Sequence, residues 1–417
     1  MIRFRCPHYI AISLFCKIIT ALVITSFCSL AGDTFRVATY NILNFPEALG
    51  LQRIDHLRTV IEYLEPDVLV VQEMQSQDGV NMFLDSIMNH QADIYESTSF
   101  HDGPSTDNAI FYSKNTVELL HDQYLSTNNR DIAQYRLRFS KNHHEFYLFS
   151  VHFKASQGSG NEMIRLEEAT ALREHLSLFA QGSYFLVAGD YNIYYSDEPA
   201  FQYLTGDFSN NNGRLYDPLS ASGSWHENYD FADIHTQSTR YEQLADGGAG
   251  GGMDDRFDMI LCSHSFIDST GLFFTDYSYK IVGNDGNHFN ISINDGYNSA
   301  VPSDVADALY YASDHLPVFV DIDDGNAQTI PERTLKIWPN PMKTSAYVEF
   351  PWADDFESAN IILTNVIGQR VYENTMSDPS GFVLRRGSLP IGVYFVHVKV
   401  KTRYNTISYR SKLAVVD

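Results

Sequence analysis

Polar side chains that suit metal ions and phosphate groups follow short apolar runs at several places in this chain. The run 185–188 ends in Gly189, and Asp190 and Asn192 come directly after it. Because strand side chains alternate, residues i and i+2 lie on one face, so this carboxylate and this amide can share a ligand. The ends of the other apolar runs supply Asn41, Glu73, His152, Asp258, Asp314 and His315.

Together these side chains have the chemistry that hydrolyses a phosphate ester with Mg²⁺ or a similar hard cation. Such a cation takes oxygen ligands, needs few carboxylates, and keeps several waters and a phosphate oxygen. The transition state gathers negative charge, which a metal, an amide and an imidazolium can stabilise. A histidine backed by a carboxylate can act as a base or hold positive charge near neutral pH. We therefore predict Mg²⁺ or Mn²⁺ as the catalytic ion, with Ca²⁺ as a structural alternative.

Apolar periodicity predicts the elements that must position these residues. Strands are predicted over 35–41, 67–73, 108–112, 134–139, 145–151, 185–188, 256–261 and 313–321. Helices are predicted over 50–64, about 79–90 and 162–180. Pro66 stops the first helix, and Asn161 is the expected cap of the third. Residues 205–255 are rich in Gly, Asn and Asp, which predicts loops that border a functional rim.

Both ends of the chain differ from its body, which spans 33–323. In 1–31, basic residues precede an apolar run too short for a permanent anchor, which predicts a cleaved signal peptide; an uncleaved anchor is the alternative. Cleavage of the signal peptide would remove the other cysteines and leave Cys262. The apolar residues next to Cys262 in the sequence predict that it lies in the core. Residues 324–333 form a polar linker, and 334–417 show short alternating strands, the pattern of a small β-sandwich.

The formal charge of −23 is distributed unevenly along the 417 residues. The leader 1–31 has three basic and no acidic side chains, and 334–417 has ten basic and seven acidic ones, so 32–333 holds −29. A body this acidic repels polyanions at long range and lacks the basic surface of a tight nucleic-acid binder. It suits an extracellular protein that works with divalent cations.

Motifs in a fixed order resemble the endonuclease/exonuclease/phosphatase superfamily, the fold of pancreatic deoxyribonuclease, over about 33–323. They are Thr39-Tyr-Asn41, Val71-Gln-Glu73, Val151-His152-Phe-Lys154, Gly189-Asp190-Tyr-Asn192, Arg256-Phe-Asp258 and Ser313-Asp314-His315. Each motif is weak by itself, and their shared order makes the resemblance specific. It implies an α/β fold, a four-layer αββα sandwich, in which all the motifs meet at one rim.

The resemblance also implies roles for the acidic and amide residues. By position, Glu73 would be the principal metal ligand, and Asn41 and Asp314 would assist it. Asp190 and Asn192 would orient or deprotonate the attacking water and hold the phosphate.

The histidines and the basic residues complete the set. Asp258 would hydrogen-bond His315 and keep it cationic, and His152 would be the second histidine, for which Asp107 is a guessed acidic partner. Lys154 shares the face of His152 by strand alternation and is a candidate for phosphate contact. Further rim cations would be Arg165 and Arg256. Solvated surface groups are the alternative for Lys154 and Arg165.

The tail resembles the carboxy-terminal sorting domain of the type IX secretion system of Bacteroidetes. Trp338-Pro-Asn-Pro341, Asn365-Val-Ile-Gly368, Leu389-Pro-Ile-Gly392 and Lys412-Leu-Ala-Val-Val416 carry the match, although the family more often has Tyr or Phe at the position of Trp338. The resemblance implies an immunoglobulin-like sandwich that engages the secretion machinery, export through the periplasm of a Gram-negative cell, and release or surface attachment. The alternative is a small sandwich that binds carbohydrate or packs on the body.

These observations predict a secreted metal-dependent phosphodiesterase, an endonuclease that hydrolyses DNA or RNA. One alternative keeps the metal site and changes the substrate, to a phosphomonoester or to a phospholipid as in sphingomyelinases. The acidic body favours that alternative. The other alternative is a surface binding protein on an inactive scaffold, against which the complete set of polar positions argues.

Overall fold

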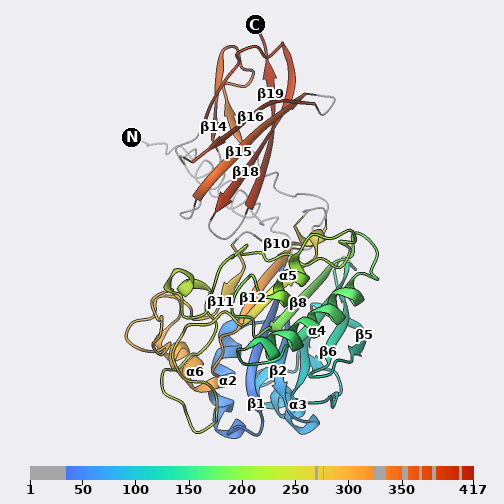
Figure 1. Ribbon diagram of the computed structural model, residues 1–417, viewed down its shortest axis with the longest axis vertical. Coiled ribbons are helices and arrows are strands. Elements are labelled where there is room, and N and C mark those ends of the chain that lie inside the picture. Colours follow the sequence, from blue (N-terminus) through green and yellow to red (C-terminus); the bar gives the residue numbers. More distant parts are fainter. Residues whose placement is uncertain are drawn as a thin grey trace, which may run out of the picture. The chain divides into compact units, whose positions relative to one another are not determined.

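The computed structural model describes residues 34–141, 143–267, 271–275, 277–323, 335–349, 356–365, 369–377, 382–402 and 406–417. The expected signal peptide 1–31 and linker 324–333 lie outside these residues, so both stay predictions. Figure 1 shows a body of sheets and helices and an all-β region at the carboxyl end of the chain. Each is described separately below.

One sheet of the body carries the first two motifs. Its strand order is β10-β12-β1-β2-β4-β3, and β11 also pairs with β12. The strands are β1 (Thr34–Phe45), β2 (Val68–Met74), β3 (Tyr95–Ser97), β4 (Asp107–Ser113), β10 (Phe273–Phe274), β11 (Lys280–Ile281) and β12 (Val318–Asp323). β1 is parallel to β2 and antiparallel to β12. The carboxyl ends of β1 and β2 therefore share an edge with the residues that lead into β12.

The second sheet carries the central motifs in the order β5-β6-β7-β8-β9. Its strands are β5 (Val117–Leu125), β6 (Ile132–Phe139), β7 (Glu145–His152), β8 (Phe185–Asp190) and β9 (Asp258–Cys262). β7 is parallel to β8, and β8 is antiparallel to β9. The carboxyl ends of β7 and β8 thus meet the first residue of β9.

Helices cover the outer faces of both sheets and give four layers (Figure 1). The helical elements are α2 (Gly50–Leu64), α3 (Gln77–Phe83), η1 (Leu84–Met88), α4 (Ser159–Leu176), α5 (Pro199–Thr205), η2 (Tyr229–Ile234), η3 (His264–Phe266) and α6 (Ser303–Ala312). Strand alternation separates the cores: in β2, Leu69 and Val71 pack towards the helices, while Val68 and Val70 pack between the sheets. The predicted αββα sandwich is the observed fold.

Most predicted elements of the body are present, with differences at their ends. The helix predicted over 50–64 is α2, and Glu65 ends it in the left-handed conformation before Pro66. The cap predicted for the third helix is wrong, because Gly158 holds that position and Asn161 lies in the first turn, where it bonds back to Gln157. Cys262 is a buried core residue, as predicted.

The carboxy-terminal region is all β. One sheet contains β13 (Lys336–Trp338), β14 (Ser345–Glu349) and β17 (Phe382–Arg385), and the other contains β15 (Phe356–Asn365), β16 (Arg370–Met376), β18 (Gly392–Thr402) and β19 (Thr406–Val415). Apolar residues of both sheets, such as Val348 and Val398, share one core. This matches the small sandwich predicted for the tail. No helix among the described residues is long and apolar enough to cross a membrane.

Candidate active site

The polar residues predicted at strand ends lie at one edge of the two packed sheets, which we call the rim. Asn41 and Glu73 are near the carboxyl ends of β1 and β2, and His152 and Asp190 end β7 and β8. His152 is directly opposite Asp190, and Asp190 is directly opposite Asp258, in the strand register. The topology thus brings together residues that are far apart in the chain.

Buried polar side chains connect the two sheets beneath the rim. Thr39 Oγ1 donates to Gln72 Oε1 (3.1 Å), and Gln72 Nε2 donates to Ser150 Oγ (3.0 Å). Ser150 Oγ donates to Asn108 Oδ1 (2.9 Å), and all four side chains are buried. Leaving any of these groups without a partner would be costly in the interior, so the connected bonds hold the sheets in register below the site.

The carboxylates of Glu73 and Asp190 converge on one amide and one imidazole. Asn41 Nδ2 donates to Glu73 Oε1 (3.0 Å) and to Asp190 Oδ2 (3.1 Å). His152 Nε2 lies 3.8 Å from the same Glu73 oxygen and 3.5 Å from the same Asp190 oxygen. Burial raises the pKa of the Asp190 carboxyl, and neighbouring carboxylates raise it further. Such a concentration of negative charge favours a cation.

Two backbone features bring these carboxylates to their places. The pairing of β2 with β4 shifts between Val71 and Met74, and Glu73 has a φ of 66°. A bulge of this kind re-aims a side chain at the end of a strand. At Gly189, a Cβ atom would lie 2.0 Å from the carbonyl oxygen of Val151, so only glycine lets β8 approach β7 this closely.

His315 is paired with Asp258 beneath the rim. Its Nδ1 donates to Asp258 Oδ2 (2.7 Å), and its Nε2 lies 3.8 Å from Asp190 Oδ2. All three side chains are buried. Burial alone would lower the pKa of His315, but the carboxylates of Asp258 and Asp190 outweigh it and raise the pKa well above the ordinary value. His315 therefore presents a positive charge to the rim at neutral pH.

His152 has a different neighbour from the one expected. Its Nδ1 lies 3.3 Å from the hydroxyl of Thr106, and not beside the carboxylate of Asp107. Asp107 Oδ1 instead accepts the backbone N–H of Gly103 (3.0 Å), and burial raises the pKa of Asp107 to about 6. Burial lowers the pKa of His152 well below its ordinary value, and nearby Arg130 adds to this effect.

The carbonyl of Phe153 accepts hydrogen bonds from Asn192 and Arg130, and Lys154 follows Phe153 in the chain. Asn192 Nδ2 and Arg130 Nη1 both donate to this oxygen, at 3.2 and 2.9 Å. The backbone N–H of Asn192 also donates to Asp190 Oδ1 (3.0 Å). Lys154 is half-buried and close enough to lower the pKa of the next-but-one residue, His152. Within the described residues neither Arg130 nor Lys154 forms an ion pair, so both can meet an anion.

Asp314 is held by backbone and side-chain donors from the long loop. Its Oδ2 accepts the N–H of Ala249 (2.7 Å) and the Nε2 of Gln237 (3.1 Å). Its Oδ1 is buried and has no partner within the described residues. Gly248 packs so closely that an added Cβ would lie 3.1 Å from Asp314 Cγ. The glycine-rich stretch thus packs directly against Asp314.

Two predicted rim cations are not at the rim. Arg165 is fully buried, and its Nε donates to Glu198 while its Nη1 donates to the carbonyl oxygen of Lys154 (2.8 Å). Arg256 is also fully buried and donates two hydrogen bonds to Asp217, at 2.9 and 2.8 Å. A buried guanidinium needs a carboxylate partner, and these pairs satisfy that need inside the body. Neither guanidinium can therefore meet a substrate phosphate in this conformation.

The donor set at the rim fits a hard divalent cation. Glu73 and Asp190 point oxygens at a common centre, and the buried Oδ1 of Asp314 lacks a donor among the described residues. Oxygen donors of this kind select Mg²⁺, Mn²⁺ or Ca²⁺. Asn41 differs from its expected role, because its Oδ1 accepts the N–H of Leu43 (3.0 Å) and its amide nitrogen faces the carboxylates.

A second group of possible metal ligands lies in the long loops. His226, Asp254 and Asp255 place ligand atoms within 4.8 Å of one another, and His226 Nδ1 lies 2.7 Å from Asp255 Oδ1. These three residues were not predicted from the sequence, and neither were Thr106, Arg130 and Gln237. Asp254 and Asp255 immediately precede the Arg256-Phe-Asp258 motif, and Arg130 precedes β6. Their position next to a motif or a strand is the sequence feature that could have identified them.

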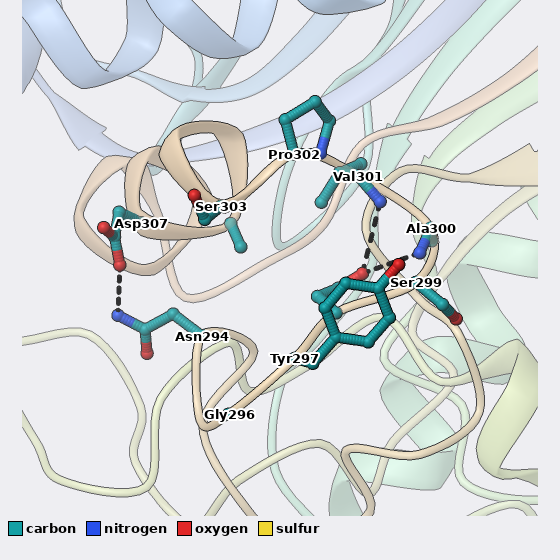
Figure 2. A pocket seen from close by; sticks show the side chains of 11 residues that line it. Asn294, Gly296, Tyr297, Ser299, Ala300, Val301, Pro302, Ser303 and Asp307 are labelled. Atoms are coloured by element: carbon teal, nitrogen blue, oxygen red, sulfur yellow. Dashed lines mark hydrogen bonds between the residues drawn. The ribbon is translucent and has the colours of Figure 1, made fainter.

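One pocket of the body lies away from the rim. Figure 2 shows this pocket of about 470 Å³ between α6 and the loop before it. Asn298 Oδ1 accepts the N–H groups of Ala300 (2.9 Å) and Val301 (3.2 Å), and Asn294 donates to Asp307 (2.9 Å). These bonds brace the loop itself. The pocket contains none of the rim residues.

Two protein-family models match the chain. The family model described as "Endonuclease/Exonuclease/phosphatase family" matches residues 38–315. The chain belongs to this family. A second model, described as "Secretion system C-terminal sorting domain", matches residues 336–412. Members of the endonuclease/exonuclease/phosphatase family are phosphoester hydrolases, and the sorting domain belongs to type IX secretion.

Solved structures also resemble the chain, at low identity. D. rerio TDP2 in complex with a single-stranded DNA product is 15% identical with a TM-score of 0.48, covering 70% of this chain and 99% of that one. The human Nocturnin catalytic domain with bound sulfate is 19% identical with a TM-score of 0.45, covering 70% of this chain and 94% of that one. A Bacteroides thetaiotaomicron mannosyl-6-phosphatase is 17% identical with a TM-score of 0.44, covering 69% of this chain and 99% of that one. No curated protein matches the chain.

Proposed function

We propose that the protein is a secreted, divalent-metal-dependent phosphodiesterase and that DNA or RNA is its substrate. One observation carries the proposal: the carboxylates of Glu73 and Asp190 converge beside His152, while the Asp258–His315 pair supplies a fixed positive charge on the other side. This arrangement can accept a phosphate group together with a metal ion.

The residues of the rim can divide the work of hydrolysis. Glu73 would hold the metal with Asp314 assisting, Asn41 would orient the Glu73 and Asp190 carboxylates through its amide nitrogen, and the bound ion would neutralise charge on the phosphate. Asp190 and Asn192 would orient the attacking water, whose oxygen forms the new bond to phosphorus. The proton from that water ends on the ester oxygen, which leaves as an alcohol. His315 would stay charged against a non-bridging oxygen.

Arg130 and Lys154 support a substrate with further phosphates. They are near His152 and form no ion pair within the described residues, so they offer cations beside the reacting group. A polyanion needs such local charges, because the body as a whole is acidic. Arg165 and Arg256 add no such charge, because both are buried in ion pairs.

The buried arginines favour a second candidate, a phosphomonoesterase or phospholipid phosphodiesterase at the same site. A substrate with one phosphate needs fewer rim cations than a nucleic acid does. The acidic His226–Asp254–Asp255 group adjoins the rim through the backbone bonds of Asp255 to Gln237, and it disfavours a second phosphate there.

A zymogram can test these substrates directly. The full chain would be assayed on DNA, RNA, a sphingolipid and a phosphomonoester, each with and without a chelator. We expect chelator-sensitive cleavage of nucleic acid. Cleavage of the lipid or the monoester at far higher rates would support the second candidate, and chelator-resistant cleavage of any substrate would contradict the metal site.

The sorting domain supports export to the cell surface. We expect that deleting 334–417 leaves an active body that accumulates in the periplasm of the native host, because the tail has its own core. Immunoblots of cell fractions, with a periplasmic marker as control, measure this. Normal surface display of the shortened chain would contradict the sorting role.

A further inference from the structure

Gln237 contacts two neighbouring residues of the rim at once. Its Nε2 lies 3.1 Å from Asp314 Oδ2 and 2.6 Å from His315 Nε2. The amide nitrogen donates a hydrogen to the Asp314 carboxylate, whereas its contact with the Nε2 of the charged His315 ring is close packing, because that nitrogen carries a hydrogen of its own. A single side chain therefore contacts both Asp314 and His315.

The backbone holds Gln237 firmly in this place. Its N–H donates to the carbonyl of Asp255 (3.1 Å), and its own carbonyl accepts from the N–H groups of Asp254 and Asp255, both at 2.9 Å. Beside it, the N–H of Leu316 donates to the carbonyl of Thr236 (2.8 Å). The segment that carries the amide is thus bonded to the segment that carries Asp314 and His315, so the contact is not an accident of a loose side chain.

The amide of Gln237 is the second contact that holds the His315 ring. The first is the bond from Nδ1 to Asp258 Oδ2 (2.7 Å). With this bond alone the imidazole can pivot about its Nδ1. The contact at Nε2 prevents the pivot and keeps that nitrogen on the side of Asp190, 3.8 Å away.

At Asp314 the amide is one of two donors to the same oxygen. The other is the N–H of Ala249, at 2.7 Å. Together they fix the plane of the carboxylate, and Oδ1 is buried without a partner in the part of the chain that the structure describes. Without Gln237 the carboxylate keeps one donor and can rotate.

We propose that Gln237 is a positioning residue for phosphoester hydrolysis: its amide holds the Asp314 carboxylate and the His315 ring in the mutual orientation that the reaction requires. This inference rests on the proposed function. Partners that orient metal ligands and catalytic groups typically change activity about 10- to 100-fold when they are replaced. Misplacing a reacting group by about 1 Å has an effect of the same order.

The experiment uses the full chain with bis(para-nitrophenyl) phosphate and Mn²⁺. Gln237→Ala should lower kcat about 10- to 100-fold while KM stays within about twofold, because no substrate contact is removed. Gln237→Glu keeps the length but brings a negative charge to Asp314, so its loss should be at least as large. Gln237→Met fills the space without a donor and replaces Gln237→Ala in the test should that variant not fold.

Two matched controls separate positioning from general loosening. Gln243→Ala removes an exposed amide from the loop that follows. Ser238→Ala removes a buried hydrogen bond to Ala249 (2.8 Å) from the same segment as Gln237. Both variants should keep kcat within about threefold of the unmodified protein, because neither side chain contacts Asp314 or His315. An equal loss of kcat in Ser238→Ala and Gln237→Ala would overturn the proposal.

A second readout needs no activity. In protein labelled with ¹⁵N-histidine, the Nδ1–H signal of His315, assigned by its loss in His315→Asn, should shift in Gln237→Ala and stay unchanged in Gln243→Ala. An unmoved signal, or a kcat of Gln237→Ala within about twofold of the unmodified protein, overturns the positioning role. If the protein hydrolyses no phosphoester at all, the proposed function fails, and the His315 signal still decides whether Gln237 orients the ring.

Discussion

His152 and His315 lie on opposite sides of the same carboxylate, and their surroundings differ in charge. Their Nε2 atoms are 3.5 and 3.8 Å from Asp190 Oδ2, and both rings are about equally buried, at 3% exposure. The Nδ1 of His315 meets the carboxylate of Asp258, whereas that of His152 meets the hydroxyl of Thr106. The difference lies in the second neighbour of each ring.

The second neighbours decide the charge of each ring. Burial lowers the pKa of both histidines, and at His315 the carboxylates of Asp258 and Asp190 reverse the effect. At His152 the cations Arg130, His315 and Lys154 add to the effect of burial and lower its pKa further. At neutral pH the rim thus combines a neutral imidazole and a charged one. Equal burial does not imply equal chemistry, because the Nδ1 of His315 meets a carboxylate and that of His152 meets a hydroxyl.

Glu73→Gln should have the largest effect, since Glu73 is next to His152 and also faces Asp190 across Asn41. The substitution keeps the shape and removes the negative charge, so kcat/KM should fall by about 10²- to 10⁴-fold. The melting temperature should change little, because the side chain of Glu73 is 16% exposed. Glu62→Gln, on the exposed face of α2, is the matched control. Near-normal turnover with undiminished dependence on Mg²⁺ or Mn²⁺ would refute the role of Glu73.

The two second neighbours should differ in their effect. Asp258→Asn removes the charge that orients His315, and kcat should fall by about 10²- to 10⁴-fold, as for other carboxylates that orient a catalytic histidine. Thr106→Val removes only a 3.3 Å contact and should cost less than about tenfold. Steady-state kinetics of both variants measure the difference. Equal losses of kcat in Asp258→Asn and Thr106→Val would show that the two histidines do not depend differently on their neighbours.

Asp258 and His315 should also act as one unit. If Asp258 works through His315, the double variant Asp258→Asn/His315→Ala should be about as slow as His315→Ala alone. The control pair, Thr106→Val with His315→Ala, involves residues that do not touch, and its losses should multiply. Multiplicative losses for Asp258 and His315 would show that the pair is not coupled.

The sequence predicted the fold because strand and helix signals agreed along the body. The alternation of apolar residues in β1 and their helical spacing before Pro66 are local properties of the sequence. The folded chain therefore contains the strand and the helix that they predict. Strand ends identified Glu73 and Asp190, since parallel strands deliver their last residues to one edge. These two residues do meet in the structure, 3.8 and 3.5 Å from His152.

The errors concern partners chosen by the tertiary structure. Nothing in the local sequence distinguishes the buried Arg165, which meets Glu198, from Arg130, which forms no ion pair within the described residues. Gln237 lies in a polar loop far from any apolar run, so periodicity gave no signal for it. Charge pairing and loop contacts join residues distant in sequence, and a one-dimensional pattern does not contain them.

The smallest effects should come from the cations on the His152 flank, and they test whether this flank holds a substrate with several phosphates. Arg130→Ala and Lys154→Ala should each raise the KM for DNA several-fold and leave kcat nearly unchanged, since they lie beside the reacting group. A phosphate contact contributes about 0.9 to the slope of log K against log salt, so each variant should make that slope shallower by about one unit. Lys114→Ala removes an equal charge from an exposed turn and should change neither quantity.

With bis(para-nitrophenyl) phosphate, which has no second phosphate, the Lys154 variant should behave like the unmodified protein. An unchanged KM and slope on DNA for both variants would assign the flank to a substrate with a single phosphate.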